Sequence, residues 1–322
     1  MPNRTRRLSK AVNIQAPGKV VVWGEYAVLD GAPACVMAID RYANVSVQRA
    51  ENIQLSASGF QSDPVTKTDP GWSRAPVAQL TETILSAWGY SQYPEGVQIH
   101  QDSSAFHDAR GRKLGIGSSA AVCVALYRGL AELLNKKTSL AEAIELHRAF
   151  QQGSGSGLDV AASWLGGIIR FQQGDAVAKT WPDDLNFCLV FTGQSASTYD
   201  QVQAFSSWRE KADTRTLADL VACSQLLDEK LTYQKLEQYI HQLRQLDRAA
   251  KLNIFTPEHE ALSDLAQRCE IIYKPCGAGG GDIGMAFAQT SSGNESLARF
   301  KSLAREKFDV LDVNIAKPHR LN

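Results

Sequence analysis

The chain has 322 residues, of which 44% are hydrophobic and 21% are charged, and its formal net charge at pH 7 is zero. This length and composition are typical of a globular protein with one large or two ordinary domains. A neutral chain has no global field to attract nucleic acid or an anionic membrane, so a ligand that carries phosphate would need cations placed locally. No stretch has the roughly 20 apolar residues that span a bilayer.

The cysteines and histidines indicate neither a disulfide framework nor a metal site. The six cysteines are scattered without a CxxC pair, and the six histidines show no HExxH or other ligand spacing. We therefore expect reduced core cysteines in a cytoplasmic protein. The basic segment "MPNRTRRLSK" lacks an apolar stretch, so we interpret it as a solvated tail rather than a secretory signal, with a nucleic-acid arm as the alternative.

Strand and helix patterns follow one another along the whole chain. Partly alternating, β-branched runs predict strands, and apolar residues at helical spacing predict helices. Strands are expected at residues 12–23 and 34–47, in "GVQIH", near Ile168, on both sides of the glycines in "EIIYKPCGAGGGDIGMAF", and near Val310. Helices are expected at residues 75–88, 118–134 and 139–150, from about Leu158, in several long segments after residue 198, and after the last glycine-rich loop.

These elements predict an α+β protein with two domains. Strands precede helices in both halves, but the two types do not alternate strictly, which argues against a doubly wound parallel sheet. The composition changes between residues 180 and 195 without a Pro/Gly-rich linker. We therefore expect an N-terminal domain at residues 1–187 and a C-terminal domain at residues 188–322.

The first of three glycine-rich motifs is "APGKVVVWGEYAVLDGAPA", residues 16–34. Pro17 and Gly18 turn the chain and bring Lys19 to the start of a buried apolar run. A lysine at this position must either extend its amine to solvent or meet an anion, because an unpaired buried charge is costly.

The second motif is "RKLGIGSSAAVCVALYRGL", in which small residues run directly into an apolar helix. Gly115 and Gly117 allow the backbone to approach a ligand closely, since glycine has no Cβ. The helix that follows would present unpaired N–H groups and its positive dipole end, which together attract phosphate. An ordinary turn with a serine N-cap is the alternative.

The third motif, "KPCGAGGGDIG", lies between two apolar strands, where a flexible linker has no reason to occur. A functional loop is therefore favoured. Between the second and third motifs, Asp159 follows "GSGSGL" at the start of a helix. Its carboxylate could cap that helix, or it could act on an acceptor oxygen within hydrogen-bond reach.

The sequence lacks the motifs of several other nucleotide-binding classes. It contains no GxxxxGK[ST] and no protein-kinase HRD or DFG set, and "LGIGSSA" is not a complete GxGxxG. A Walker-type site and a dinucleotide site are therefore not expected.

The three motifs, in this order and with "SGLD" between the second and third, resemble the GHMP kinases, the family of galactokinase, homoserine kinase, mevalonate kinase and phosphomevalonate kinase. The resemblance runs from about Val12 to Val313. It implies an N-terminal domain like ribosomal protein S5 domain 2, a ferredoxin-like C-terminal domain, and a site that uses ATP and Mg²⁺.

The resemblance also implies roles for individual positions. Lys19 and Asp159 match the catalytic pair of the family. The expected ATP-binding residues are Lys113, Gly115, Gly117, Ser118, Ser119 and Ala120. The expected substrate-binding residues are Lys19, Glu25, Tyr26, Ser156, Gly157, Asp159, Ser197, Gly277, Ala278, Gly279 and Gly280.

Within the family, several features resemble the phosphomevalonate kinase branch. They are "GEYAVL" in place of the "GEH" usual in mevalonate kinases, Lys113 at the second motif, "GSGSGLDVAAS" before "GGIIRF", and the aspartate of "GAGGGD". The expected acceptor is mevalonate 5-phosphate, in a monomer or a homodimer. A mevalonate kinase or another small-molecule kinase of the family is the alternative, and a non-catalytic metabolite sensor is a further one.

One departure concerns the metal. Mevalonate kinases carry a glutamate Mg²⁺ ligand eleven residues before the catalytic aspartate, and this chain has Arg148 there. Glu145 lies one turn before Arg148 on the same predicted helix. Glu145 and Ser119 of the second motif are the predicted metal ligands. Arg148 itself is interpreted as a solvated residue, with a cation in the site as the alternative.

A phosphate acceptor changes what the site needs. Its oxygen is largely anionic at pH 7, because the second pKa of a phosphate monoester is about 6. Asp159 would then position Lys19 or the substrate rather than remove a proton. The repulsion between two anions would raise the need for cations, with Lys113 the best placed and Arg110 and Arg112 weaker candidates.

Overall fold

The computed structural model describes residues 10–319 except 61, 152, 154 and 212–214. The predicted solvated tail, residues 1–9, lies outside the described part. The chain divides into two compact units, each assembled from three stretches. The first unit contains residues 1–18, 41–107 and 118–164, and the second contains residues 19–40, 108–117 and 165–322. The predicted domain boundary between residues 187 and 188 stays a prediction.

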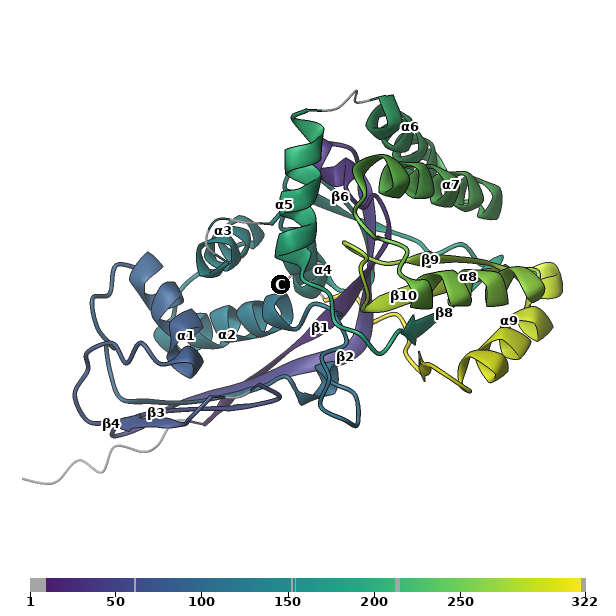
Figure 1. The fold of residues 1–322 in the computed structure, drawn as a ribbon. Helices are drawn as coiled ribbons and strands as arrows, with labels where there is room; N and C mark the ends of the chain where they lie inside the picture. Colours follow the sequence, from purple (N-terminus) through teal and green to yellow (C-terminus); the bar gives the residue numbers. More distant parts are fainter. Residues whose placement is uncertain (1–9, 61, 152, 154, 212–214, 320–322) are drawn as a thin grey trace, which may run out of the picture. The chain divides into compact units, whose positions relative to one another are not determined.

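The first unit is a small sheet with helices packed on it. β5 (Val97–Asp102) pairs antiparallel with the second half of β2 (Ala34–Arg49) and parallel with β3 (Ile53–Ser58), which pairs with β4 (Val65–Lys67). The helices α1 (Pro76–Ala87), α2 (Ser118–Leu134) and α3 (Leu140–Phe150) pack on one another, with α1 against β3 and α2 against β5 (Figure 1). The short η2 (Ser104–Phe106) and α4 (Leu158–Leu165) complete this unit.

The second unit contains parts of two sheets. The first half of β2 pairs antiparallel with β6 (Ile168–Gln172), and β6 pairs with β7 (Asp175–Lys179). β1 (Val12–Trp23) pairs with β2, and η1 (Ala27–Asp30) lies between them in the chain. A separate four-stranded sheet has the order β11-β8-β10-β9. Its strands are β8 (Leu185–Phe191), β9 (Ile272–Pro275), β10 (Ile283–Gln289) and β11 (Asp309–Leu311).

Helices cover this four-stranded sheet because their apolar sides face it. α8 (Pro257–Arg268) and α9 (Thr290–Ala304) lie next to each other and contact β9 and β10 (Figure 1). Leu262, Leu265 and Phe300 share one buried cluster with Val190 and Ala286 of the strands. α5 (Thr198–Arg209), α6 (Arg215–Glu229) and α7 (Tyr233–Ala250) form the other helical group, in which α6 packs on α7 and α7 contacts β9 and β10.

The predicted helix at residues 118–134 is confirmed with these bounds, and the strands at 12–23 and beside the third motif are confirmed too. The sequence patterns missed β3, β4, β7 and β8. β4 has three residues, and β7 is largely exposed, so neither carries a clear apolar signal. No described helix combines the length and the hydrophobicity that a membrane crossing requires.

Candidate active site

The second unit brings the first and second motifs into direct contact. The backbone N–H of Lys19, in β1, donates to the carbonyl oxygen of Ile116 at 2.8 Å. A Cβ built on Gly117 would lie 3.1 Å from both Cγ and Cε of Lys19, so the lysine side chain runs along the glycine. Gly117 also has φ +83°, a region that favours glycine. In the structure, glycine at this position allows the Lys19 side chain to lie close to the backbone. The predicted close approach of a ligand stays a prediction.

Gly115 joins the second motif to the third. A Cβ at this position would come 2.2 Å from Cγ of Asp282, so any larger residue would collide with that carboxyl group. Asp282 directly follows the glycine run and is held on several sides. Its N–H donates to the carbonyl oxygen of Gln194 at 2.7 Å, and Oδ1 accepts from the N–H of Ala196 at 3.2 Å. The Ser195 hydroxyl donates to the carbonyl oxygen of Lys113 at 3.2 Å.

Asp282 is a residue of this site that the sequence analysis used only as a mark of one family branch. Burial raises the pKa of its carboxyl group above the ordinary value, while the Ala196 N–H and the charges of Lys19 and Lys113 lower it. Both lysines therefore act on this carboxylate. Its position depends on partners about 90 residues or more away in the chain, a signal that local patterns do not contain.

The glycine loop of the third motif, residues 277–281, connects β9 to β10 and is anchored at three points, one of them the N–H of Gly280, which donates to the carbonyl oxygen of Ile254 at 3.2 Å. The Tyr26 hydroxyl donates to the carbonyl oxygen of Ala278 at 2.5 Å. His259, fully buried, lies 2.9 Å through Nε2 from the carbonyl oxygen of Gly281 and 2.8 Å through Nδ1 from the Tyr273 hydroxyl. A carbonyl can only accept, so Nε2 carries the proton and Nδ1 accepts.

Glu25 lies inside the protein rather than on an open surface. It is 4% exposed, and its two carboxylate oxygens accept from the Lys274 amine and from the Tyr239 hydroxyl, the latter at 2.7 Å. The Tyr239 oxygen in turn accepts from the N–H of Gly24 at 2.9 Å. The role of Glu25 as a substrate ligand stays a prediction. Its observed contact with Lys274 joins the first motif to the third.

The first unit holds the start of the apolar helix. Ser118, Ser119 and Ala120 form the first turn of α2. The Ser119 Oγ lies 2.8 Å from Nε2 of His147 and accepts from the Gln151 amide at 3.4 Å. The end of α3 is therefore bonded to the first turn of α2, where unpaired N–H groups are available to an anion.

Asp159 lies in the first turn of α4, where its Oδ1 accepts from the N–H of Val160 at 2.9 Å. Arg148 holds the segment that precedes it. Its guanidinium donates to the carbonyl oxygens of Gly155 at 3.1 Å and Ser156 at 3.0 Å. The Arg148 side chain is 36% exposed and also pairs with Glu145 at 2.7 Å, so it is a partly solvated residue with three bonded partners, and its part in the site stays a prediction.

The predicted site residues divide between the units. The second unit holds Lys19, Glu25, Tyr26, Lys113, Gly115, Gly117, Ser197, Gly277, Ala278, Gly279 and Gly280, and the first unit holds Ser118, Ser119, Ala120, Glu145, Ser156, Gly157 and Asp159. Ser197 caps α5 by accepting from the N–H of Asp200 at 3.3 Å. The pairing of Lys19 with Asp159 stays a prediction.

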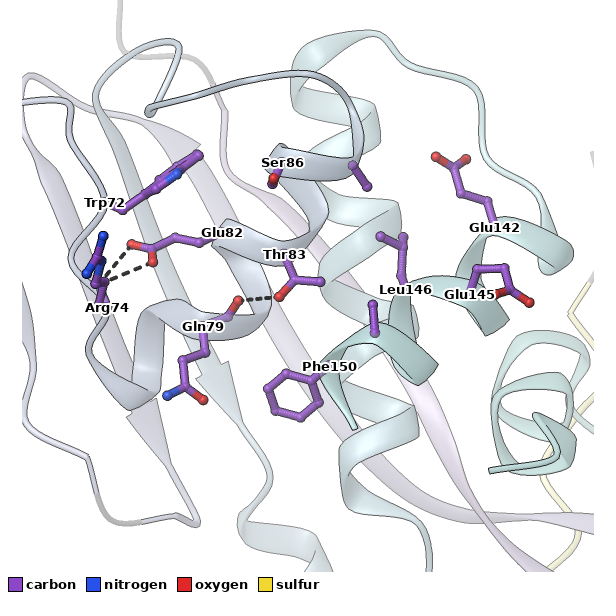
Figure 2. Close-up of a pocket in the computed structure, with 12 residues that line it drawn as sticks. Trp72, Arg74, Gln79, Glu82, Thr83, Ser86, Glu142, Glu145, Leu146 and Phe150 are labelled. Atoms are coloured by element: carbon purple, nitrogen blue, oxygen red, sulfur yellow. Dashed lines mark hydrogen bonds between the residues drawn. The ribbon is translucent and has the colours of Figure 1, made fainter. Parts of the chain in front are cut away.

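A polar groove of about 1010 Å³ lies between α1 and α3 of the first unit (Figure 2). Figure 2 shows Gln79, Thr83 and Phe150 around one end, and Trp72 beside Glu82 at the other. Glu82 is already bonded, because it accepts from the N–H groups of Ser73 at 2.6 Å and Arg74 at 3.2 Å. Arg74, Glu142 and Glu145 also line the groove, where Glu142 accepts from Trp88 Nε1 at 2.9 Å and Glu145 from Arg148 at 2.7 Å. Its three carboxylates therefore already have partners, and it offers aromatic and neutral polar groups beside them.

Comparison with known proteins shows what the chain is similar to. Residues 77–167 match the model of the GHMP kinases N terminal domain. A phosphomevalonate kinase of Streptomyces sp. (strain CL190) is 29% identical over 87% of this chain and 90% of its own length. The chain thus resembles the GHMP kinases, by a family model over residues 77–167 and by a relative over most of its length. A mevalonate kinase of Thermococcus sibiricus is 28% identical over 58% of the chain and 59% of its own length.

The chain also has the fold of a solved phosphomevalonate kinase. The Streptococcus pneumoniae phosphomevalonate kinase, solved in complex with phosphomevalonate and AMPPNP, superimposes with a TM-score of 0.74. The two chains share 20% identity, and the superposition covers 94% of this chain and 99% of the other. The predicted α+β, two-domain fold class is thereby confirmed.

Proposed function

We propose that this chain is a GHMP kinase that transfers the γ-phosphoryl group of ATP to mevalonate 5-phosphate and releases mevalonate 5-diphosphate. One observation carries the proposal: in the second unit Lys19 is bonded to the loop at Gly115–Gly117, and Asp282 of the third motif lies in close contact with Gly115 of the same loop. The similarity to a curated phosphomevalonate kinase over nine-tenths of that protein's length supports the choice of acceptor.

Phosphoryl transfer requires positioning and charge neutralisation more than covalent chemistry by the protein. The loop that contains Gly115 and Gly117, with the first turn of α2, would supply backbone N–H groups to the phosphates. Lys19 would lie between donor and acceptor, where its charge stabilises the transferring group. Losing such a contact typically costs on the order of 10²–10³ in rate.

The acceptor phosphate gives Lys113 a specific role. Two anions must approach each other, so a second cation beside Lys19 lowers the repulsion between them. Lys113 acts electrostatically on the same carboxylate as Lys19, which supports this placement. Asp159 would orient the acceptor or Lys19, because a phosphate oxygen needs no general base at pH 7.

The groove between α1 and α3 is the proposed place of the nucleoside. The end of α3 bonds Ser119 in the first turn of α2, so the groove begins one helical turn from the proposed phosphate site. Phe150 and Trp72 offer aromatic faces to a purine, and Gln79 and Thr83 offer hydrogen bonds. A site of this composition fits a neutral base better than a charged group.

Mg²⁺ is the proposed counter-ion of ATP, and the residues present suit a metal held mostly by phosphate. The described residues contain no group of three His, Cys, Asp or Glu side chains that could hold a metal ion. Mg²⁺ bound to a nucleotide uses few protein ligands. Ser119 fits this role, since its hydroxyl lies in the first turn of α2, whereas the Glu145 carboxylate is already paired with Arg148. When bound, the metal neutralises phosphate charge.

The proposed setting is the cytoplasm, with small molecules as the only ligands of a monomer or homodimer. All six cysteines are free, and five of them are buried, which is the pattern of a reducing compartment.

The test is ADP release from Mg·ATP with mevalonate 5-phosphate, run beside mevalonate, homoserine and galactose. Turnover with the phosphate ester alone supports the proposal. Turnover with mevalonate in preference would make the chain a mevalonate kinase. Binding of ATP and metabolite without turnover of any acceptor would make it a sensor.

A further inference from the structure

Two consecutive residues of the first motif bind two residues of the third motif. Glu25 accepts from the Lys274 amine, and Tyr26 donates to the carbonyl oxygen of Ala278 at 2.5 Å. Lys274 is in β9 and Ala278 is in the glycine loop, so the two contacts bracket the point where the strand becomes the loop. All four residues belong to the second unit.

The first contact is a fully buried ion pair. The side chains of Lys274 and Glu25 are 0% and 1% exposed. The Lys274 amine also lies 3.4 Å from the carbonyl oxygen of Val21, and Tyr239 occupies the second oxygen of Glu25. A buried pair of this kind is weak evidence for stability, because desolvation of both charges offsets their attraction. Its directional bonds instead define one separation between β1 and β9.

The second contact comes from a residue with an unusual backbone. Tyr26 has φ +60°, a conformation that is rare for a bulky side chain and persists only when the surroundings enforce it. The Tyr26 ring lies 4.9 Å from that of Phe205 in α5, centroid to centroid. The turn is thus held so that the Tyr26 hydroxyl reaches the glycine loop.

We propose that Glu25, Tyr26 and Lys274 are positioning residues that hold the third-motif glycine loop at one place relative to Lys19. This inference rests on the proposed function, because the loop matters only if it closes on a bound substrate. Without these contacts, the loop keeps its bonds at Gly280 and Gly281, while the part that contains Gly277 and Ala278 populates other conformations. The apparent dissociation constant then rises by the inverse of the fraction that is correctly placed.

The experiment compares three variants with the wild-type protein. Tyr26→Phe removes one hydroxyl and keeps the ring packing on Phe205. Glu25→Gln leaves Lys274 buried without its counter-ion. The double variant Glu25→Gln/Lys274→Met removes both charges and restores much of the stability that the single change costs. Each is measured for Tm, for kcat and KM of both substrates, and for hydrogen exchange of the amides at residues 277–282.

If these residues position the loop, the variants should change KM and loop hydrogen exchange independently of Tm. We expect Tyr26→Phe to raise the KM for the acceptor about fivefold to tenfold with a smaller change in kcat, as for one lost hydrogen bond. The double variant should regain Tm over Glu25→Gln, yet keep a raised KM and faster exchange at residues 277–282. Wild-type KM and exchange in both Tyr26→Phe and the double variant would overturn the proposal.

Ser224→Ala is the matched control, since it removes a buried hydroxyl bonded to Leu220 within α6, outside the three motifs. It should leave KM and loop exchange unchanged. If the wild-type protein turns over none of the acceptors, the proposed function fails. Loop exchange in the variants still decides the positioning role in that case, because it requires no turnover.

Discussion

The side chain of Lys19 lies against Gly117, so closely that a methyl group added to Gly117 would be 3.1 Å from both Cγ and Cε of the lysine. The backbone N–H of Lys19 is also bonded to the neighbouring Ile116 carbonyl at 2.8 Å. The loop of the second motif therefore fixes both the main chain and the alkyl chain of this lysine. A substitution in this loop should therefore displace Lys19 as well as lower the stability of the protein.

Gly117→Ala should lower kcat by about 10², because the added methyl group displaces the Lys19 side chain from its place. The positive φ adds a stability cost of about 1–3 kcal/mol. Gly111→Ala is the control: this residue has φ +77° and open space around it. It should lose similar stability in a urea titration and keep its kcat. Equal kcat losses in both variants would show that strain, rather than Lys19, is responsible.

Asp159→Asn separates the two classes of acceptor. With mevalonate 5-phosphate we expect kcat to fall about tenfold, since the acceptor oxygen is already anionic. An alcohol acceptor would lose on the order of 10²–10⁴, because it needs a general base. Steady-state kinetics measure both, with the exposed Asp264→Asn as control. A severe loss with a confirmed phosphate acceptor would contradict the argument.

Arg148→Met should lower kcat about tenfold with little change in Tm. The substitution keeps much of the aliphatic length and removes the bonds to the carbonyl oxygens of Gly155 and Ser156, so the segment before Asp159 loses its support. The ion pair with Glu145 is exposed and contributes about 0–1 kcal/mol at most.

Arg305→Met, which breaks the exposed pair with Asp312, is the comparison for Arg148→Met. It should leave both kcat and Tm close to wild type. A kcat loss in Arg148→Met no larger than in Arg305→Met would remove Arg148 from the site.

Phe150→Ala should raise the KM for ATP roughly twofold to tenfold and leave the KM for the acceptor unchanged, because aromatic contacts of this kind contribute about 0.5–1.5 kcal/mol. Phe60→Ala, at a 39% exposed phenylalanine outside the groove, is the control. Titration with a fluorescent ATP analogue measures the same effect without turnover. An unchanged affinity for nucleotide would place the purine elsewhere.

His259 predicts a pH dependence of stability. Burial lowers the pKa of this histidine to about 4, below its ordinary 6.5. The unfolded chain therefore binds this proton first as the pH falls, and the free energy of unfolding decreases between pH 6.5 and 4. The cost reaches about 2 kcal/mol by pH 5.

Urea unfolding at pH 7, 6 and 5 measures this slope, and His259→Gln should lack it while being less stable at pH 7. Exposed histidines contribute equally to both proteins and cancel in the difference. The same slope in both proteins would show that His259 ionises normally.

Local chemistry made much of this molecule predictable. The helix that starts at Ser118 has small and apolar residues throughout, so its bounds followed from the pattern alone. The ion pair of Glu25 and Lys274 could not be predicted, because 249 positions separate the two residues and neither local sequence indicates a buried charge. The bonds from Arg148 to the carbonyl oxygens of Gly155 and Ser156 could not be predicted either, because backbone carbonyls leave no mark in a sequence.

The way the chain is distributed between its two units has a consequence for synthesis. The chain passes from one unit to the other after residues 18, 40, 107, 117 and 164. A ribosome makes the strand of Lys19 and the loop at Gly117 early, yet the remaining part of their unit begins only at Leu165 and includes β11, at Asp309–Leu311. The early segments therefore cannot complete their fold until the later part of the chain has been synthesised. Catalytic competence would then appear only after β11 has been synthesised, and no contiguous fragment of the chain contains one unit without part of the other.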